Sequence, residues 1–397
     1  MRKKRRKYLY WIAAFLLIFF VLPNVINFWE QRFFSEEVRL KEAKKLTANN
    51  ADSAKIIPGE YYKRGSLHHF FFGKKNRDMW TSPVTVKVLH IDSVKGGLSP
   101  YDIGGSQQTI SVKLKDTAGK HWVIRSVNKD QQNALPKILR HTALRFMFRD
   151  QVASMNPYAP LVAASLAESA QLPHCNPELF WMPYNEKHKA YNEKIAGRLV
   201  YLEENYDTTW HHQLYNAIDI VDTDDMLELQ QKQKISIDTL LYLKNRLFDM
   251  LICDWDRHEG QWRWALIDSA GQKRFMPIAK DRDMAMYVFD EGILSHITLA
   301  INNKFQSFRN EIASVDGLMH QAKKLDEKIL KSVSREQFIA AAKQLQAQIT
   351  SAAMEKAFLS YPSEIRQRFA PQHQQILLSR LQKMPVVAEE FYKLVND

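Results

Sequence analysis

The sequence predicts an α+β protein with two lobes, a β-rich N-lobe and a helical C-lobe, after an N-terminal transmembrane helix. Residues 8–29 carry no charge, residues 82–127 alternate apolar and polar side chains as strands do, and helical periodicity dominates from residue 314 to the end. The chain has 397 residues, of which 45% are hydrophobic and 25% charged. This composition supports a substantial buried core, and it excludes a small disulfide scaffold and a disordered tail.

The N-terminus has the pattern of a membrane anchor. Six cations in residues 1–7 precede 22 uncharged residues, 8–29, which as a helix would cross an apolar layer of about 30 Å. The positive-inside rule then keeps the basic tail in the cytoplasm and places the main domain in the periplasm or another extracytoplasmic space. A cleaved signal peptide is the alternative, because the most apolar part is short and Pro23 follows it, but no small-residue cleavage pattern is found.

The charge balance does not indicate a nucleic-acid partner. The net charge of +12 comes from 56 basic against 44 acidic residues, and the terminal cluster supplies half of that excess. The two cysteines, Cys175 and Cys253, are too few for a disulfide framework, and we expect both to be buried as small apolar side chains. No histidine pair has zinc-site spacing with cysteines nearby.

The remaining elements follow in order along the chain. Residues 30–57 are expected to form a juxtamembrane helix and a polar linker. The β-rich N-lobe, residues 58–205, contains a hairpin around Thr117–Gly119, a helical stretch and a strand pair at its end. The helical C-lobe, residues 206–397, is interrupted by a second hairpin around Ala270–Gly271, and Ser334 with Gln337 gives a capping-box signal.

Carboxylates gather at the two ends of the second hairpin. The text DWDRHEGQWRW precedes it and IAKDRDMAM ends it, which brings together four aspartates: Asp254, Asp256, Asp281 and Asp283. Burying carboxylates is costly unless they meet cations or a metal ion, so this pattern indicates a site for a polyanion and a metal. A network of Asp–Arg pairs that only holds a loop is the alternative.

Phosphoryl transfer fits this set of side chains. Such a site needs a carboxylate to orient a hydroxyl, a carboxamide and a second carboxylate to hold magnesium, and cations for the phosphates. Asp256 could orient the hydroxyl, and Gln261 with one of Asp281 or Asp283 could hold the metal.

A possible nucleotide site lies in the β-rich lobe. Gly104 and Gly105 precede the first hairpin, and paired glycines let backbone amides approach a phosphate, although an ordinary turn explains them equally well. Arg125 and Lys129, on and after the next strand, could reach the phosphates or be solvated charges.

The order of these motifs resembles a group of kinase-like proteins. A glycine loop, a strand with a basic residue, GRLVYLEE, DWDRHEGQ and PIAKDRDMAM follow one another as in CotH-type spore-coat kinases, and similar text occurs in HipA-type and secretory-pathway kinases. The resemblance implies a two-lobed protein-kinase-like fold that uses ATP and Mg²⁺ or Mn²⁺. It makes Asp256 the catalytic residue, and it makes Gln261, where asparagine is usual, and Asp281 or Asp283 the metal ligands.

The resemblance also assigns nucleotide contacts. It places the nucleotide near the strand that ends at Glu203, and it gives the phosphate-binding lysine's role to Arg125 or Lys129. The helix glutamate that pairs with this lysine has no clear counterpart, and Asp150 and Glu168 are the candidates.

A closer resemblance covers about residues 58–395. The text YKRGSLHHFFFGKKNRDMW, GGLSPYDIGGSQQTISVKL, VIRSVNKD and SRLQKMPVVAEEFYKLV is similar to an uncharacterised bacterial kinase-like envelope domain, often found beside metallophosphoesterase domains. No metallophosphoesterase signature is present in this chain.

These observations lead to two main hypotheses. The first is a membrane-anchored, kinase-like phosphotransferase that uses ATP and a divalent metal on an unknown acceptor, either an envelope protein or a small molecule. The second is a catalytically inactive, pseudokinase-like envelope module that binds or scaffolds. A sugar-nucleotide transferase with Asp281 and Asp283 as its D-x-D motif is disfavoured, because such enzymes usually have a doubly wound sheet.

Overall fold

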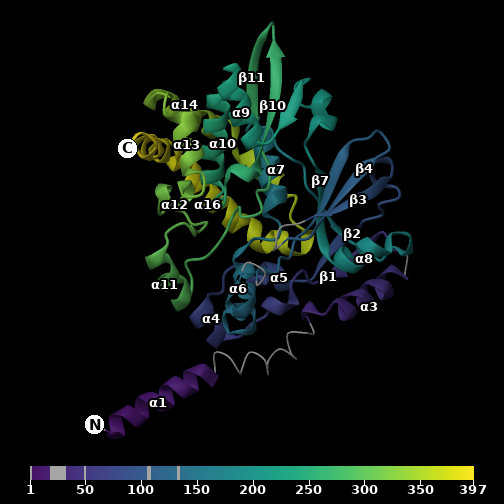
Figure 1. The fold of residues 1–397 in the computed structure, drawn as a ribbon, viewed down its shortest axis with the longest axis vertical. Coiled ribbons are helices and arrows are strands. Elements are labelled where there is room, and N and C mark those ends of the chain that lie inside the picture. Colours follow the sequence, from purple (N-terminus) through teal and green to yellow (C-terminus); the bar gives the residue numbers. More distant parts are fainter. Residues whose placement is uncertain (1, 18–32, 49–50, 105–108, 132–134) are drawn as a thin grey trace.

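The computed structural model describes residues 2–17, 33–48, 51–104, 109–131 and 135–397. Figure 1 shows a sheet-rich part on one side and a helical part on the other, with an extended hairpin at the end opposite the N-terminus. The chain is therefore an α+β protein with a sheet-rich lobe and a helical lobe, as predicted.

A seven-stranded sheet forms the first lobe. Its strand order is β1-β2-β6-β7-β5-β4-β3, and β2 with β6 is its one parallel pair within the described residues. The strands are β1 (Ser53–Ile56), β2 (Val84–Val88), β3 (Leu98–Gly104), β4 (Ser111–Asp116), β5 (His121–Ser126), β6 (Glu178–Trp181) and β7 (Leu199–Glu204).

Two predictions for this lobe are confirmed. The alternating text around Thr117–Gly119 forms the antiparallel β4–β5 hairpin, whose turn contains Gly119 at a φ of 84°. The strand pair expected near residues 177–204 is β6 with β7. Strand β7 lies in the middle of the sheet, and Leu199 to Glu203 are all buried, which explains why the apolar run LVYL does not alternate.

The helices of this part of the chain lie before the first strand and between later strands. They are α1 (Arg2–Leu16), α3 (Glu36–Thr47), α4 (Ser66–Phe72), α5 (Arg77–Thr81), α6 (Leu144–Asp150), α7 (Ala159–Ser169) and α8 (Lys189–Ile195). Helix α3 lies where a helix was expected within residues 30–57, and the side chain of Ser35 caps it by accepting from the backbone N–H of Val38. The linker expected up to residue 57 contains β1, so the sheet begins before residue 58.

The helical lobe carries a small sheet of its own. Its strands are β8 (Asp219–Val221), β9 (Ser236–Ile237), β10 (Trp262–Ser269) and β11 (Gln272–Ala279), in the order β8-β10-β11-β9. Its helices are α9 (Thr223–Gln233), α10 (Thr239–Leu251), α11 (Ile293–Ile301), α12 (Val315–Met319), α13 (Lys323–Leu330), α14 (Arg335–Gln348), α15 (Ser351–Phe358) and α16 (Ser363–Asn396). The expected hairpin at Ala270–Gly271 is β10–β11, and the Ser334–Gln337 capping box begins α14.

Helix α10 is the central element of this lobe. Every residue from Tyr242 to Leu251 is buried, and Asp238 caps its start by accepting from the N–H of Leu241 at 3.0 Å. The tilted rings of Tyr242 and Trp262 lie 4.9 Å apart, which fixes the start of β10 against α10. Cys175 and Cys253 are buried and free, as expected.

The predicted membrane anchor receives no support from the structure. Helix α1 begins at Arg2, within the basic tail, and ends at Leu16, and residues 18–29 of the expected span lie outside the described residues. Within the described part of the chain, no helix is both long enough and apolar enough to cross a membrane.

Candidate phosphoryl-transfer site

The loop after α10 and the segment after β11 lie side by side because of the hairpin between them. In the β10–β11 register Trp262 pairs with Ala279, so the residues before β10 face those after β11. The N–H of Lys280 donates to the carbonyl of Gln261 at 3.1 Å, which continues this alignment beyond the strands. The loop with Asp254, Asp256 and Gln261 thereby meets the segment with Asp281 and Asp283, as the sequence predicts.

Asp249 of α10 holds both segments in place, because it binds one arginine from each of them. Arg257 donates to its carboxylate through Nε at 2.8 Å and Nη2 at 3.1 Å, and Arg282 donates through Nε at 3.0 Å. All three side chains are almost fully buried. Burial alone would raise the pKa of Asp249, but Arg257 and Arg282 outweigh it and lower the pKa to about 2.

This cluster is the Asp–Arg network considered as an alternative, with a different carboxylate at its centre. It holds the loop through Asp249 and occupies Arg257 and Arg282, which leaves Asp256 and Asp283 outside it. Sequence reasoning missed Asp249. Its signal was an aspartate within the apolar text YLKNRLFDMLI, since such a residue requires a buried cation nearby.

Asp281 and Asp283 meet the two basic residues of the sheet-rich lobe. Arg125 of β5 donates through Nη2 to Oδ1 of Asp281 at 2.5 Å, and Nζ of Lys129 lies 2.5 Å from Oδ2 of Asp283. The backbone φ of Asp281 is 59°, so it lies in the left-handed region. These ion pairs join the two lobes at the predicted site.

Glu203 pairs with Arg125 from the neighbouring strand. Nε of Arg125 lies 3.0 Å from Oε1 of Glu203, because β5 and β7 are adjacent antiparallel strands. Neither candidate for the helix glutamate takes this place. Asp150 accepts from Arg77 at 2.8 Å, and Glu168 is exposed and pairs with Lys356 at 2.9 Å.

The close approach of these carboxylates separates their pKa values. Burial is the main cause that raises the pKa of Asp283 to about 6, and the negative charge of Asp281 adds to it. The positive charge of Lys129 opposes this shift. Burial raises the pKa of Glu203 to about 7, although Arg125 opposes the shift. The pKa of Asp281 is lowered despite its burial, because Arg125 and Lys129 both stabilise its negative charge. Divergent pKa values among neighbouring acids are typical of functional sites.

Two buried oxygen atoms beside these ion pairs have no hydrogen-bond donor within the described residues. They are Oε1 of Gln261 and Oδ2 of Asp254, the latter 3.6 Å from Nη2 of Arg257. Burial raises the pKa of Asp254 to about 8, and although Arg257 opposes the shift, Asp249, Asp256 and Asp283 add to it. An unpaired buried acceptor is costly, so both oxygens are suited to a cation.

Asp256 is more accessible than Asp254, which is buried. It is half-buried, and its Oδ1 accepts from Nε2 of Gln321 at 3.2 Å. Its exposure leaves it open to a substrate, as a residue that orients a hydroxyl requires.

The glycine loop is only partly described. Gly104 is the last residue of β3 and pairs with Ser111, whereas Gly105 lies outside the described residues. Thr109, the first described residue after Gly105, lines a cavity together with Arg125 and Asp283. Gly104 does not line this cavity.

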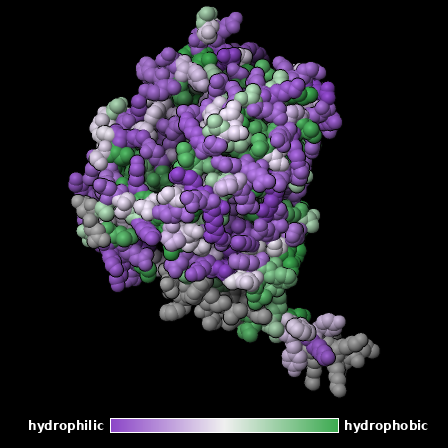
Figure 2. All heavy atoms as spheres, turned by 180° about the vertical axis from the view of Figure 1, so that it is seen from behind, coloured by the Kyte–Doolittle hydropathy of each residue, from purple (hydrophilic) through white to green (hydrophobic). Residues whose placement is uncertain are grey.

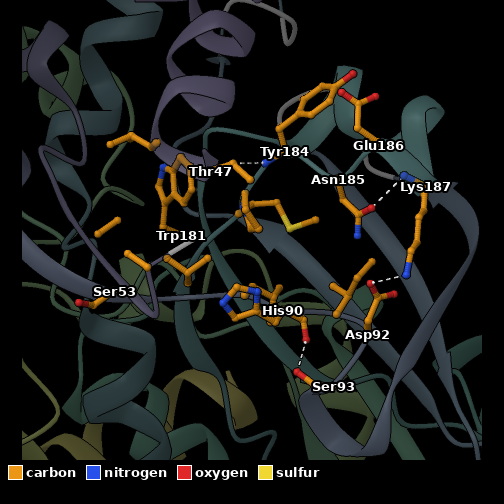
Figure 3. Close-up of a pocket in the computed structure, with 18 of the residues that line it drawn as sticks. Thr47, Ser53, His90, Asp92, Ser93, Trp181, Tyr184, Asn185, Glu186 and Lys187 are labelled. Atoms are coloured by element: carbon orange, nitrogen blue, oxygen red, sulfur yellow. Dashed lines mark hydrogen bonds and ion pairs between the residues drawn. The ribbon is translucent and has the colours of Figure 1, made fainter. Parts of the chain in front are cut away.

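The space beside the ion pairs is small. The cavity next to Asp281 and Glu203 has a volume of about 20 Å³, and the one next to Asp283 about 10 Å³. A cavity of about 680 Å³ lies elsewhere, between the ends of α3 and β2 and the segment after β6 (Figure 3). Its rim carries His90 and the Asp92–Lys187 ion pair, and no described residue of the predicted site lines it.

No cluster of three or more His, Cys, Asp or Glu side chains in the described part of the chain is placed to hold a metal ion. A magnesium site that acts on a nucleotide differs, because one or two carboxylates suffice when the phosphates supply further oxygens. Asp283 and Gln261 carry oxygen atoms of the kind that such a site uses.

Comparison with known proteins places the chain in no family. No family model matches it, and no curated protein does. Among solved structures, the crystal structure of the Helicobacter pylori proinflammatory kinase CtkA is similar, with 14% sequence identity over 75% of this chain and 96% of that chain. The TM-score is 0.39, which is too low for conclusions about this chain.

Proposed function

We propose that this protein is a kinase-like phosphotransferase that uses ATP and a divalent metal ion. The observation that supports it best is the meeting of the D-x-D segment with Arg125 and Lys129, directly beside the loop that carries Asp256 and Gln261. This arrangement combines cations for phosphates, oxygens for a metal and an accessible carboxylate.

Each side chain then has a distinct role. Arg125, held by Glu203, and Lys129 bind phosphate oxygens once they exchange their carboxylate partners for the nucleotide. Asp283 and Gln261 hold Mg²⁺ or Mn²⁺, which neutralises charge on the phosphates. Asp256 accepts a hydrogen bond from the acceptor hydroxyl and orients it towards the phosphate. Gly104 and Gly105 remain candidates for backbone contacts with the phosphates.

The test of this proposal is nucleotide turnover by the full chain. We expect ADP formation from ATP that needs Mg²⁺ or Mn²⁺ and falls at least about a hundredfold in Asp256→Asn, the range for loss of a general base. Asp224→Asn, an exposed change on α9, is the matched control and leaves the rate unchanged. A rate that is equal in wild type and Asp256→Asn contradicts the role of Asp256.

A second candidate function is a non-catalytic binding module. Two observations favour it: the cavities beside the ion pairs hold about 20 and 10 Å³, and Gln261 stands where related kinases have asparagine. A longer amide changes the position of the metal relative to the phosphates. Metal-dependent binding of ATP without ADP formation is the result expected for this alternative.

A further inference from the structure

Helices α4 and α11 both turn an apolar face outward. On α4 the exposed side chains Leu67, Phe70 and Phe71 are spaced i, i+3 and i+4, so they share one face. On α11 the exposed Ile293, Ile297 and Ile301 follow one another every four residues, with Ile301 83% exposed. The two helices pack against each other, and we call these six residues the α4–α11 patch.

This pattern is the reverse of an ordinary surface helix, whose outer face is polar. Helix α11 has the sequence ILSHITLAI, in which His296 is the one titratable side chain. Its inner side already packs against the main core through Leu299, so the exposed isoleucines are additional to what the fold needs. Large contiguous apolar surfaces of this kind mark interaction sites.

The patch is a fixed surface because a close glycine contact locks the two helices together. Gly73 ends α4 at a φ of 85°, and Gly292 precedes α11 at a φ of 82°. A Cβ atom on Gly292 would lie 2.3 Å from the backbone N of Gly73, so no other residue fits there. Glu291 adds one link between the two segments, since it accepts from the N–H of Lys75 at 2.7 Å, and Arg309 donates to the same carboxylate at 2.7 Å.

The position of the patch indicates what covers it. Helices α4 and α11 lie at the end of the molecule from which α1 extends (Figure 1), and hydrophobic atoms gather along that edge in Figure 2. Helix α1 contains the first part, residues 8–16, of the uncharged sequence of residues 8–29, which is suited to a bilayer. Exposed lysines flank α4 on both sides, Lys63 before it and Lys74 after it.

We propose that the α4–α11 patch inserts into the interface of a bilayer that contains anionic phospholipids. Phenylalanine, leucine and isoleucine side chains enter the boundary between headgroups and acyl chains, while nearby lysines meet the negative lipid headgroups. The domain then lies against the membrane, and the β10–β11 hairpin points away from it. This inference is independent of the proposed phosphotransferase activity.

The test uses a fluorescent label on the full chain in vesicles of phosphatidylcholine and phosphatidylglycerol. Ser66→Cys places the label on α4, one turn from Phe70, without changing the patch, and the native cysteines are buried and do not compete. Ser269→Cys, exposed at the tip of β10–β11, is the matched control. Nitroxides attached to the lipids should quench the label at position 66 several-fold more strongly than the label at position 269.

A double substitution in the patch distinguishes insertion of the patch from attachment of the chain to the vesicle by another segment. Phe70→Ser with Ile297→Ser, added to Ser66→Cys, should reduce quenching to the level of position 269, with no change in melting temperature because both side chains are exposed. Equal quenching at positions 66 and 269, or quenching unaffected by the double substitution, overturns the proposal. The label at position 66 could also become less accessible to solvent in the absence of lipid as the protein concentration rises. That result would overturn the proposal and indicate that a second copy of the chain covers the patch.

Discussion

Nη2 of Arg125 lies 2.5 Å from Oδ1 of Asp281, although 156 positions separate the two residues in the chain. Strand β5 of the sheet-rich lobe and the segment after β11 are thereby joined by a charge-assisted hydrogen bond, and Lys129 with Asp283 adds a second link. Asp283, the carboxylate proposed to hold the metal, and its neighbour Asp281 are thus both already paired with cations of the other lobe. In the proposed function, nucleotide and metal compete with these pairs, so their binding would require the two ion pairs to separate.

Removing one of the competing cations should separate metal binding from nucleotide binding. In Lys129→Met, Asp283 loses its partner, and we expect a loss of about 1–3 kcal/mol in unfolding free energy without ligands. Mg²⁺ alone should then stabilise the variant more than wild type, because it no longer competes with an ammonium group, whereas ATP should bind more weakly. Thermal unfolding with each ligand separately measures both effects, and tighter ATP binding in the variant would contradict the role of Lys129.

The Asp249 network should be structural and not catalytic. Asp249→Asn removes the carboxylate that lies closest to the buried guanidinium groups of Arg257 and Arg282, so we expect a loss of about 3–5 kcal/mol in unfolding free energy. Asp256→Asn is the comparison, because Asp256 is half-buried and its partner among the described residues is the amide of Gln321. Urea denaturation of both variants checks this, and similar losses in the two would show that Asp256 belongs to the same network.

A buried histidine should make stability sensitive to moderate acid. His373 of α16 is 8% exposed, its Nδ1 lies 2.8 Å from the hydroxyl of Tyr361, and burial lowers its pKa from 6.5 to about 4. Between these values the unfolded chain binds the proton and the folded chain does not. Stability from this group is therefore complete above pH 6.5, and it falls by up to about 3 kcal/mol as the pH drops towards 4.

His373→Gln should flatten this part of the pH profile, since glutamine does not titrate. His212→Gln, at an exposed histidine, is the control and should leave the slope as in wild type. Melting temperatures between pH 4 and 7 measure the difference, and an unchanged slope in His373→Gln would assign the acid sensitivity to other groups.

The sequence predicted those parts of the fold that depend on local pattern. The β4–β5 and β10–β11 hairpins follow from alternating strands around glycine-containing turns, and the start of α14 follows from a capping box. Strand β1 was not predicted, because its four residues, SAKI, are too short a run to stand out within a polar linker, and the strand depends on pairing with β2.

The sequence predicted which residues meet at the candidate site, but it did not predict the ion pairs that these residues form. The hairpin alone places Asp256 and Gln261 beside Asp281 and Asp283, so their meeting could be inferred from the sequence. The pairing of Arg125 with Glu203 depends on β5 and β7 being neighbours in the sheet, and that order is set by tertiary packing. The central role of Asp249 likewise depends on which side of α10 faces Arg257 and Arg282.

The most direct test of the proposed function is a thermal-shift titration of the full chain with ATP, in the presence and absence of Mg²⁺, comparing wild type with Asp283→Ala. A ligand that binds only the folded state raises the melting temperature according to its concentration and affinity. We predict that ATP raises the melting temperature of wild type when Mg²⁺ is present and that this shift is lost in Asp283→Ala. A metal-independent shift, an equal shift in the variant, or no shift with ATP in wild type would contradict a kinase-like nucleotide site between Arg125, Lys129 and the D-x-D segment.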